Sequence, residues 1–177
     1  MVDPLPDATQ KYFDICTDKL GMIPNVLQAY AFDIEKLNAF TGLYNDVMFA
    51  ESGLSKLERE MIAVTVSSIN KCFYCLTAHG ATVRQLSGDP KLGEALVMNW
   101  RVADLDARQH AMLQFSELMT VNSASITETD RDALRQVGFS DRDIWDIAAT
   151  ASFYNMTNRM ASATDMRPND EYHALAR

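Results

Sequence analysis

Hydrophobic and polar residues recur with a helical period along almost the whole chain. Few windows alternate at every second residue, and β-branched residues do not gather into strand-like runs bounded by turn residues. The pattern therefore predicts an all-α fold. Capping residues, glycines and prolines divide it into expected helices. These cover residues 7–20, 24–30, 33–50, 55–69, 72–88, 89–100, 106–120, 127–138 and 140–164, followed by a polar tail from Arg167 that is expected to be extended.

Capping signals define several of these helix ends. Ser55–Glu58 has the capping-box pattern of a helix start, and Thr127–Asp130 resembles a second one. Asp7 and Ser140 are expected N-caps, and Gly21 is expected to end the first helix. The helix boundaries near these residues are the best specified by the sequence.

Residues 55–70 and 140–155 align without gaps, with Ser, Ile, Ala, Thr, Ser and Asn at matching positions. This similarity suggests a duplicated helical unit, although chance similarity between two helices rich in small residues is the alternative. We expect one domain over residues 1–177, with a redox core at about 54–88 and a pseudo-repeat at about 139–165. The second unit has no counterpart of the chemical residues of the first, where Glu60, Cys72, Cys75 and His79 align with Trp145, Thr157, Met160 and Thr164.

Composition narrows the classes of partner and the cellular compartment. The chain has 177 residues and a net charge of -8 with a pI near 4.8, which argues against nucleic acid and anionic membrane surfaces as partners. No apolar run approaches the roughly 20 residues that span a bilayer. Met1–Asp7 lacks the basic and apolar regions of a signal peptide. Three cysteines do not suit a disulfide framework, so a cytoplasmic location is expected.

The segment from Cys72 to His79 carries the most distinctive chemistry of the chain. Cys72 and Cys75 stand three residues apart, and His79 follows four residues later. In a helix these three side chains share one face. Two thiols beside an imidazole are typical of redox chemistry or of a metal site.

The preceding helix supplies a fourth group. Met61–Ile69 contains no charged residue, which predicts a buried helix, and Glu60 lies at its edge, where a carboxylate needs a partner. If the chain reverses at Asn70–Lys71, Glu60 lies about 15 Å back from the turn and His79 about 12 Å beyond it, so the two are nearly level. Glu58 belongs to the cap and is expected at the surface.

These four residues fit a proton relay that ends at a reactive thiol. A helix N-terminus and a nearby imidazole both favour a thiolate, and a carboxylate behind the imidazole fixes its tautomer. A second thiol can convert a sulfenic acid into a disulfide before further oxidation. The helix dipole favours Cys72 as the thiolate, whereas proximity to His79 favours Cys75, and the residues alone leave this open.

Other interpretations of the same residues remain. The two cysteines could be buried structural residues, or Cys72, Cys75, His79 and Glu60 could bind zinc. The chain offers no second CxxC or HxxxH, and it lacks the βαβ context of a thioredoxin-type domain. No phosphate loop, GxGxxG, flavin or haem motif is present, so no cofactor is expected.

The remaining chemically capable side chains are expected to be structural. Cys16 lies in line with Phe13 and Leu20, which predicts a core position rather than a third redox thiol. The others are expected to be surface histidines (His110, His173), packing residues (Phe153, Tyr154, Met160) and candidate pocket-lining amides (Asn155, Asn158).

Glu60 placed twelve residues before the CxxCxxxH motif resembles the AhpD-like alkylhydroperoxidase core within the carboxymuconolactone decarboxylase superfamily. Leu54–Ala63 is similar to the helix that leads into that motif. Gly21–Val26 and Asn155–Arg159 resemble the branch of peroxidase-related proteins. One departure is Tyr74, since well-studied alkylhydroperoxidases often have a histidine just before the second cysteine.

The resemblance implies an AhpD-like helical bundle that forms homo-oligomers (dimers, trimers or hexamers). It also implies a thiol-dependent peroxidase that reduces hydroperoxides without haem or metal and is recycled by a dithiol reductant, either thioredoxin-like or a lipoyl protein. In this family pattern Cys75 becomes the sulfenic acid, Cys72 supplies a proton and closes the disulfide, and His79 with Glu60 forms the relay.

Two alternative functions follow from the same residues. One is a metal-binding or redox-sensing oligomer without catalysis. The other is a decarboxylase-type or isomerase-type enzyme of the same superfamily that uses Glu60 and His79 as acid and base. The second alternative predicts an activity that survives loss of both cysteines.

Overall fold

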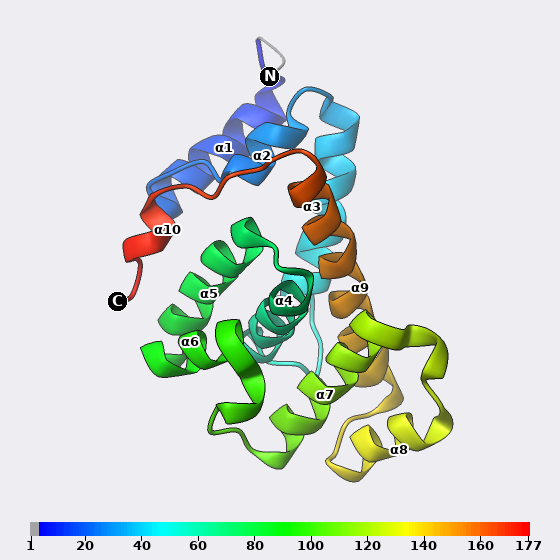
Figure 1. The fold of residues 1–177 in the computed structure, drawn as a ribbon. Coiled ribbons are helices and arrows are strands. Elements are labelled where there is room, and N and C mark those ends of the chain that lie inside the picture. The colour runs from blue at the N-terminus through cyan, green and yellow to red at the C-terminus, as the bar shows by residue number, and fades with distance from the viewer. Residues whose placement is uncertain (1–3) are drawn as a thin grey trace.

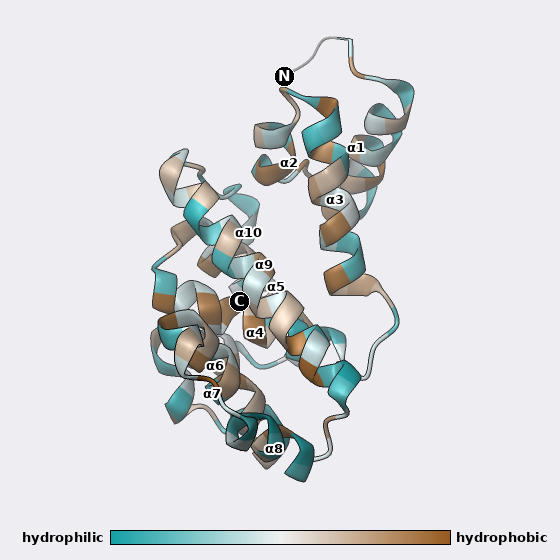
Figure 2. Cartoon of the chain, turned by 90° about the vertical axis from the view of Figure 1, so that its right-hand side faces the viewer, coloured by the Kyte–Doolittle hydropathy of each residue, from teal (hydrophilic) through white to brown (hydrophobic). Residues whose placement is uncertain are grey.

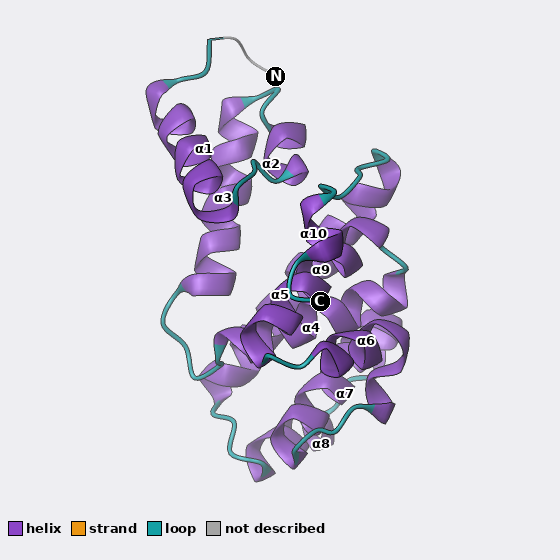
Figure 3. Ribbon diagram, turned by 90° about the vertical axis from the view of Figure 1, so that its left-hand side faces the viewer, coloured by secondary structure: helices purple, strands orange, loops and turns teal. Residues whose placement is uncertain are grey.

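Every regular element in the described part of the chain is a helix (Figures 1 and 3). The computed structural model describes residues 4–177; the first three residues, part of the segment searched for a signal peptide, lie outside them. The all-α prediction is confirmed. The helices are α1 (Asp7–Leu20), α2 (Asn25–Tyr30), α3 (Ile34–Phe49), α4 (Lys56–Asn70), α5 (Phe73–Ser87), α6 (Pro90–Asn99), α7 (Ala107–Asn122), α8 (Glu128–Gln136), α9 (Asp141–Ala163) and α10 (Glu171–Ala174), with short 3-10 turns at Trp100–Val102 and Ser123–Ser125.

Most predicted helix ends are confirmed, and two predictions are wrong. Gly21 ends α1 with φ 72, and capping boxes begin α4 at Ser55, α8 at Thr127 and α9 at Ser140. Asp7 is not an N-cap: it is the first residue of α1, and its carboxylate favours the helix through the dipole instead. The tail is not extended throughout, because residues 171–174 form α10.

Helix α4 lies at the centre of the fold, and α5, α6, α7 and α9 pack around it (Figure 1). Met61, Ile62, Ala63 and Val64 are all fully buried. A helix that is apolar on every side is stable only when other elements cover it. The central position of α4 therefore follows from its sequence.

Helices α1, α2 and α3 gather at one end of the molecule, and α6, α7 and α8 lie at the other (Figures 1 and 3). Figure 2 shows α8 as mostly hydrophilic, consistent with its single buried residue, Leu134. Helix α9 runs between the two ends and packs on α3, α4 and α7. None of the helices in residues 4–177 is both long and apolar enough to cross a membrane.

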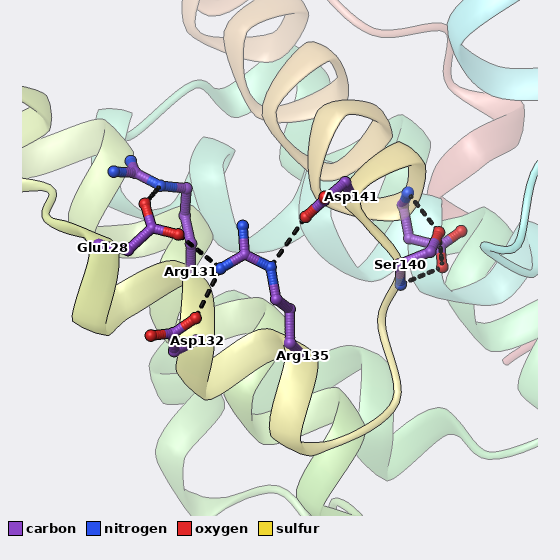
Figure 4. Close-up of polar contacts among 7 residues, drawn as sticks. Glu128, Arg131, Asp132, Arg135, Ser140 and Asp141 are labelled. Carbon is purple, nitrogen blue, oxygen red and sulfur yellow. Dashed lines mark hydrogen bonds and ion pairs between the residues drawn. The ribbon is translucent and has the colours of Figure 1, made fainter.

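The start of α9 is held by polar contacts from α8. Figure 4 shows the Arg135 guanidinium between the carboxylates of Glu128, Asp132 and Asp141, at 2.6 to 2.8 Å. Such exposed ion pairs are screened by water and contribute little individually. The capping box at Ser140 sets the start of α9, and these contacts link that start to α8.

The prediction that Glu58 is exposed is wrong, since only 8% of the residue is accessible. Its carboxylate accepts a hydrogen bond from the Ser55 backbone N–H at 2.7 Å and pairs with Arg108 Nε at 3.0 Å. Arg108 comes from α7, so its approach could not be seen from the α4 sequence. The pair closes the N-terminal end of α4.

Candidate active site

The turn between α4 and α5 sets up the site. Lys71 has a left-handed backbone with φ 57, and the Cys72 N–H donates to the Ser67 carbonyl at 3.0 Å. Cys72 is the N-cap of α5, which then packs against α4. The predicted reversal at Asn70–Lys71 is therefore confirmed, and it places the CxxC motif at a helix N-terminus.

Glu60 and His79 form a buried pair. His79 Nδ1 lies 2.7 Å from Glu60 Oε2, and the two side chains are 14% and 6% exposed. The expectation that these residues are level on neighbouring helices is confirmed. Since Nδ1 faces the carboxylate, Nε2 is the nitrogen left to exchange a proton with another group. The carboxylate thus has the partner that its burial requires.

Tyr154 of α9 is a third member of this cluster. Its hydroxyl lies 3.4 Å from His79 Nδ1 and donates to Met48 Sδ at 3.4 Å, and its ring meets the imidazole edge-on at 4.7 Å. Burial and the charge of Glu60 raise the pKa of the phenol well above its usual value, so it stays protonated. The sequence around Tyr154 predicts only a packing role, because nothing local indicates that α9 reaches His79.

Cys72 and Cys75 are both free and buried, with 1% and 4% of each residue exposed. A hydrogen bond with Cys75 lowers the pKa of the Cys72 thiol to about 7, although burial opposes this shift. The same hydrogen bond and burial raise the pKa of the Cys75 thiol. The pair therefore releases its first proton near neutral pH and shares the one that remains. The lowered pKa is that of Cys72, whereas the family resemblance implies Cys75 as the peroxidatic cysteine.

A cavity of about 490 Å³ opens onto this cluster between α1–α3 and the helices that carry the site. Cys75, His79 and Glu60 line it, whereas Cys72 does not. A small molecule that enters the cavity meets the Cys75 sulfur and not that of Cys72. Aromatic rings form much of the opposite wall, among them Tyr30, Phe40, Tyr44 and Phe153.

The structure places the other candidate residues as follows. Cys16 is buried in the core, as predicted, and also borders the cavity. His110 and His173 are exposed, as predicted. Asn155 and Asn158, which were candidates for lining a pocket, are not in the cavity lining, and both amides form hydrogen bonds with Asn70 of α4.

Tyr74, which stands where related proteins often have a histidine, has a structural contact. Its hydroxyl accepts a hydrogen bond from the Val26 N–H at 3.1 Å, which links α5 to α2. Burial raises the pKa of this phenol, so it does not exchange protons near neutral pH.

A metal site is not formed by these residues. Across residues 4–177, no three side chains of His, Cys, Asp or Glu are grouped so that they could hold a metal ion. Glu60 and His79 instead bond to each other at 2.7 Å.

The lowered pKa of Cys72 predicts how the rate of cysteine alkylation depends on pH. A thiol reacts with iodoacetamide as its thiolate, and the pKa of Cys72 falls from about 9 to about 7. We expect alkylation of the Cys72–Cys75 pair to rise through pH 7 and level off by about pH 8. Cys16, whose pKa burial raises, will react only at higher pH or after unfolding. Peptide mapping after timed alkylation separates the sites, and equal profiles for Cys72 and Cys16 would contradict the assignment.

The chain is similar to known proteins of the carboxymuconolactone decarboxylase and AhpD-like group. The family model for the carboxymuconolactone decarboxylase family matches residues 35–117. The structure of a peroxidase-related protein from Silicibacter sp. TM1040 is 72% identical, with 99% of this chain and 92% of that chain covered and a TM-score of 0.97. An AhpD-core, peroxidase-related protein from Ralstonia eutropha JMP134 is 40% identical over 98% of this chain and 91% of that chain, with a TM-score of 0.95.

A more distant likeness concerns the fold alone. The debrominase Bmp8 is 20% identical over 98% of this chain and 94% of that chain, with a TM-score of 0.79. A comparison with curated proteins gave no significant match.

Proposed function

Since the chain belongs to the AhpD-like, peroxidase-related branch of the carboxymuconolactone decarboxylase superfamily, we propose that it is a thiol-dependent peroxidase. One observation carries this proposal: Cys75 and the Glu60–His79 pair line the same cavity, and Cys72 forms a hydrogen bond with Cys75. A peroxide that enters the cavity meets the Cys75 thiol and the Glu60–His79 pair, and the second thiol is a hydrogen-bond partner of the first.

The proposed reaction begins with a proton transfer inside the dithiol. The proton moves from Cys75 to Cys72, and the Cys75 thiolate attacks one peroxide oxygen. An S–O bond forms, the O–O bond breaks, and the alcohol leaves with a proton from Cys72. Cys75 is thereby oxidised to a sulfenic acid, and the peroxide is reduced.

The second step closes the disulfide. The Cys72 thiolate attacks the Cys75 sulfur, the S–S bond forms, and hydroxide leaves. His79 Nε2 takes up a proton from the medium and passes it to the hydroxide, which leaves as water, while Glu60 holds Nδ1. An external dithiol, from a thioredoxin-like or lipoyl protein, then reduces the disulfide by thiol–disulfide exchange. Homo-oligomer formation stays a prediction.

The direct test is peroxide consumption with dithiothreitol as reductant. We expect turnover by the wild type and by Cys16→Ser, and none above background by the Cys72→Ser/Cys75→Ser double variant. Equal consumption by the double variant would overturn the proposal. Activity on a lactone substrate that survives loss of both cysteines would instead favour a decarboxylase-type enzyme that uses Glu60 and His79.

A further inference from the structure

A buried hydrogen-bond network outside the cavity lining joins α4 to α9. Asn70 Nδ2 donates to Asn158 Oδ1 at 3.0 Å, and Asn158 Nδ2 donates to Ser67 Oγ at 2.9 Å. Ser67 is fully buried and Asn158 is 1% exposed. Burial of polar groups this deeply costs free energy unless each one forms hydrogen bonds. Donor hydrogens without an acceptor inside the network therefore indicate a further acceptor beside it.

The hydrogen bonds of this network run in one order, from Asn70 to Asn158 to Ser67, and this order leaves two donor hydrogens without an acceptor in the network. Asn158 Oδ1 accepts from Asn70, so its amide nitrogen faces Ser67 and keeps a second N–H. The Ser67 oxygen accepts from Asn158, which leaves its own hydrogen to donate. The two groups with spare hydrogens are also hydrogen-bond partners of the Cys75 thiol.

These two groups lie against the Cys75 sulfur. The Ser67 carbonyl anchors the Cys72 N–H at 3.0 Å, and Ala161, one turn beyond Asn158, packs with Cys72 and Cys75. Hydrogen bonds from Asn158 and Ser67 favour the charged form of Cys75 and lower its pKa, against the stronger effects of Cys72 and burial.

We propose that Ser67 and Asn158 act as a pair of hydrogen-bond donors that hold negative charge on the Cys75 sulfur, and so select Cys75 as the cysteine that is oxidised. This inference rests on the proposed peroxidase function and assigns two residues to it. It accounts for a contrast in the site, since the lowered pKa is that of Cys72 whereas Cys75 lines the cavity.

The physical reason is preorganisation. When the proton passes from Cys75 to Cys72, charge develops on the sulfur of a residue that is only 4% exposed. Donors already aimed at that sulfur stabilise the charge without reorganising, as in an oxyanion hole. A purely structural network would tie α4 to α9 equally well but would not change the pKa of a cysteine.

The test measures the Cys75 pKa without any peroxide. In a Cys72→Ser background, Cys75 stands alone and its pKa is read from the pH dependence of alkylation. A hydrogen bond to a charged group is worth enough to shift a pKa by about one unit, so we expect Ser67→Ala to raise the Cys75 pKa by about that amount. Ser67→Thr, which keeps the hydroxyl, should restore it.

A matched control comes from the adjacent serine. Ser68 donates to the Val97 carbonyl at 2.7 Å and contacts neither cysteine, so Ser68→Ala should leave the Cys75 pKa unchanged. Thermal melts establish that each variant is folded. An unchanged Cys75 pKa in folded Ser67→Ala would overturn the inference.

A second readout separates this inference from the proposed function. With both cysteines present, a sulfenic-acid-trapping diketone should label Cys75 in the wild type and shift towards Cys72 in Ser67→Ala. A raised Cys75 pKa in a protein without peroxide turnover would support the donor pair and overturn the peroxidase. Normal turnover, with Cys75 labelled equally in both proteins, would overturn the donor pair alone.

Discussion

Replacement of Cys75 by serine will lower peroxide turnover by about three orders of magnitude or more, because a serine hydroxyl in this apolar site cannot replace a thiolate nucleophile. Of the two cysteines in the CxxC motif only Cys75 lines the cavity, so Cys72 does not meet the peroxide in the same position. The measurement is steady-state peroxide consumption with excess dithiothreitol. Retention of more than about a tenth of the wild-type rate would show that Cys72 can act as the peroxidatic thiol.

The Cys72→Ser variant should fail at the later step, in which the disulfide closes. Cys72→Ser keeps Cys75 at the cavity but removes the thiol that closes the disulfide. Its Cys75 sulfenic acid should accumulate after peroxide addition and react with a diketone reagent, whereas Cys75→Ser should show none. Cys16→Ser is the matched control, since Cys16 is also buried and borders the same cavity. It should retain wild-type turnover.

Glu60→Gln will reduce kcat/KM by about a hundredfold, within the range contributed by general acid–base groups. The carboxylate accepts the Nδ1 hydrogen of His79 at 2.7 Å and so fixes the orientation of the imidazole. Glutamine has the same shape but no charge, so the imidazole loses its orienting anion. The cysteines should still alkylate, which separates loss of the relay from loss of the dithiol.

Glu58→Gln provides the control for that variant. Glu58 lies on the same helix and is equally well buried, but it pairs with Arg108 at the helix start and contacts no site residue. It should lower the melting temperature without changing the pH profile of turnover. Equal losses of activity in Glu58→Gln and Glu60→Gln would mean that the effect is general destabilisation.

The sequence predicts the fold and the local geometry of the site well, because both depend on neighbouring residues. Helical periodicity and capping residues place most helix ends correctly. The rise per residue along two antiparallel helices suffices to bring Glu60 level with His79. Short-range rules thus account for these features.

The missed features depend on contacts between segments far apart in the chain. Tyr154 reaches His79 from 75 residues away, and Asn158 reaches Ser67 from 91 residues away. Periodicity marks these α9 residues as buried but does not say which helix they face. The sequence does not predict α10 for a similar reason, because this short helix depends on a contact with a distant residue. The Arg84 guanidinium of α5 donates to the Leu175 and Tyr172 carbonyls and holds α10 against α5.

The central claim is that Cys72 and Cys75 together reduce one hydroperoxide. The most direct measurement adds an equimolar organic hydroperoxide to the fully reduced protein without reductant, counts free thiols and maps disulfides by mass spectrometry. The account predicts loss of two of the three thiols per chain, a Cys72–Cys75 disulfide and a free Cys16. Three intact thiols with the peroxide unconsumed, or oxidation of Cys16 with Cys72 and Cys75 still free, would contradict it.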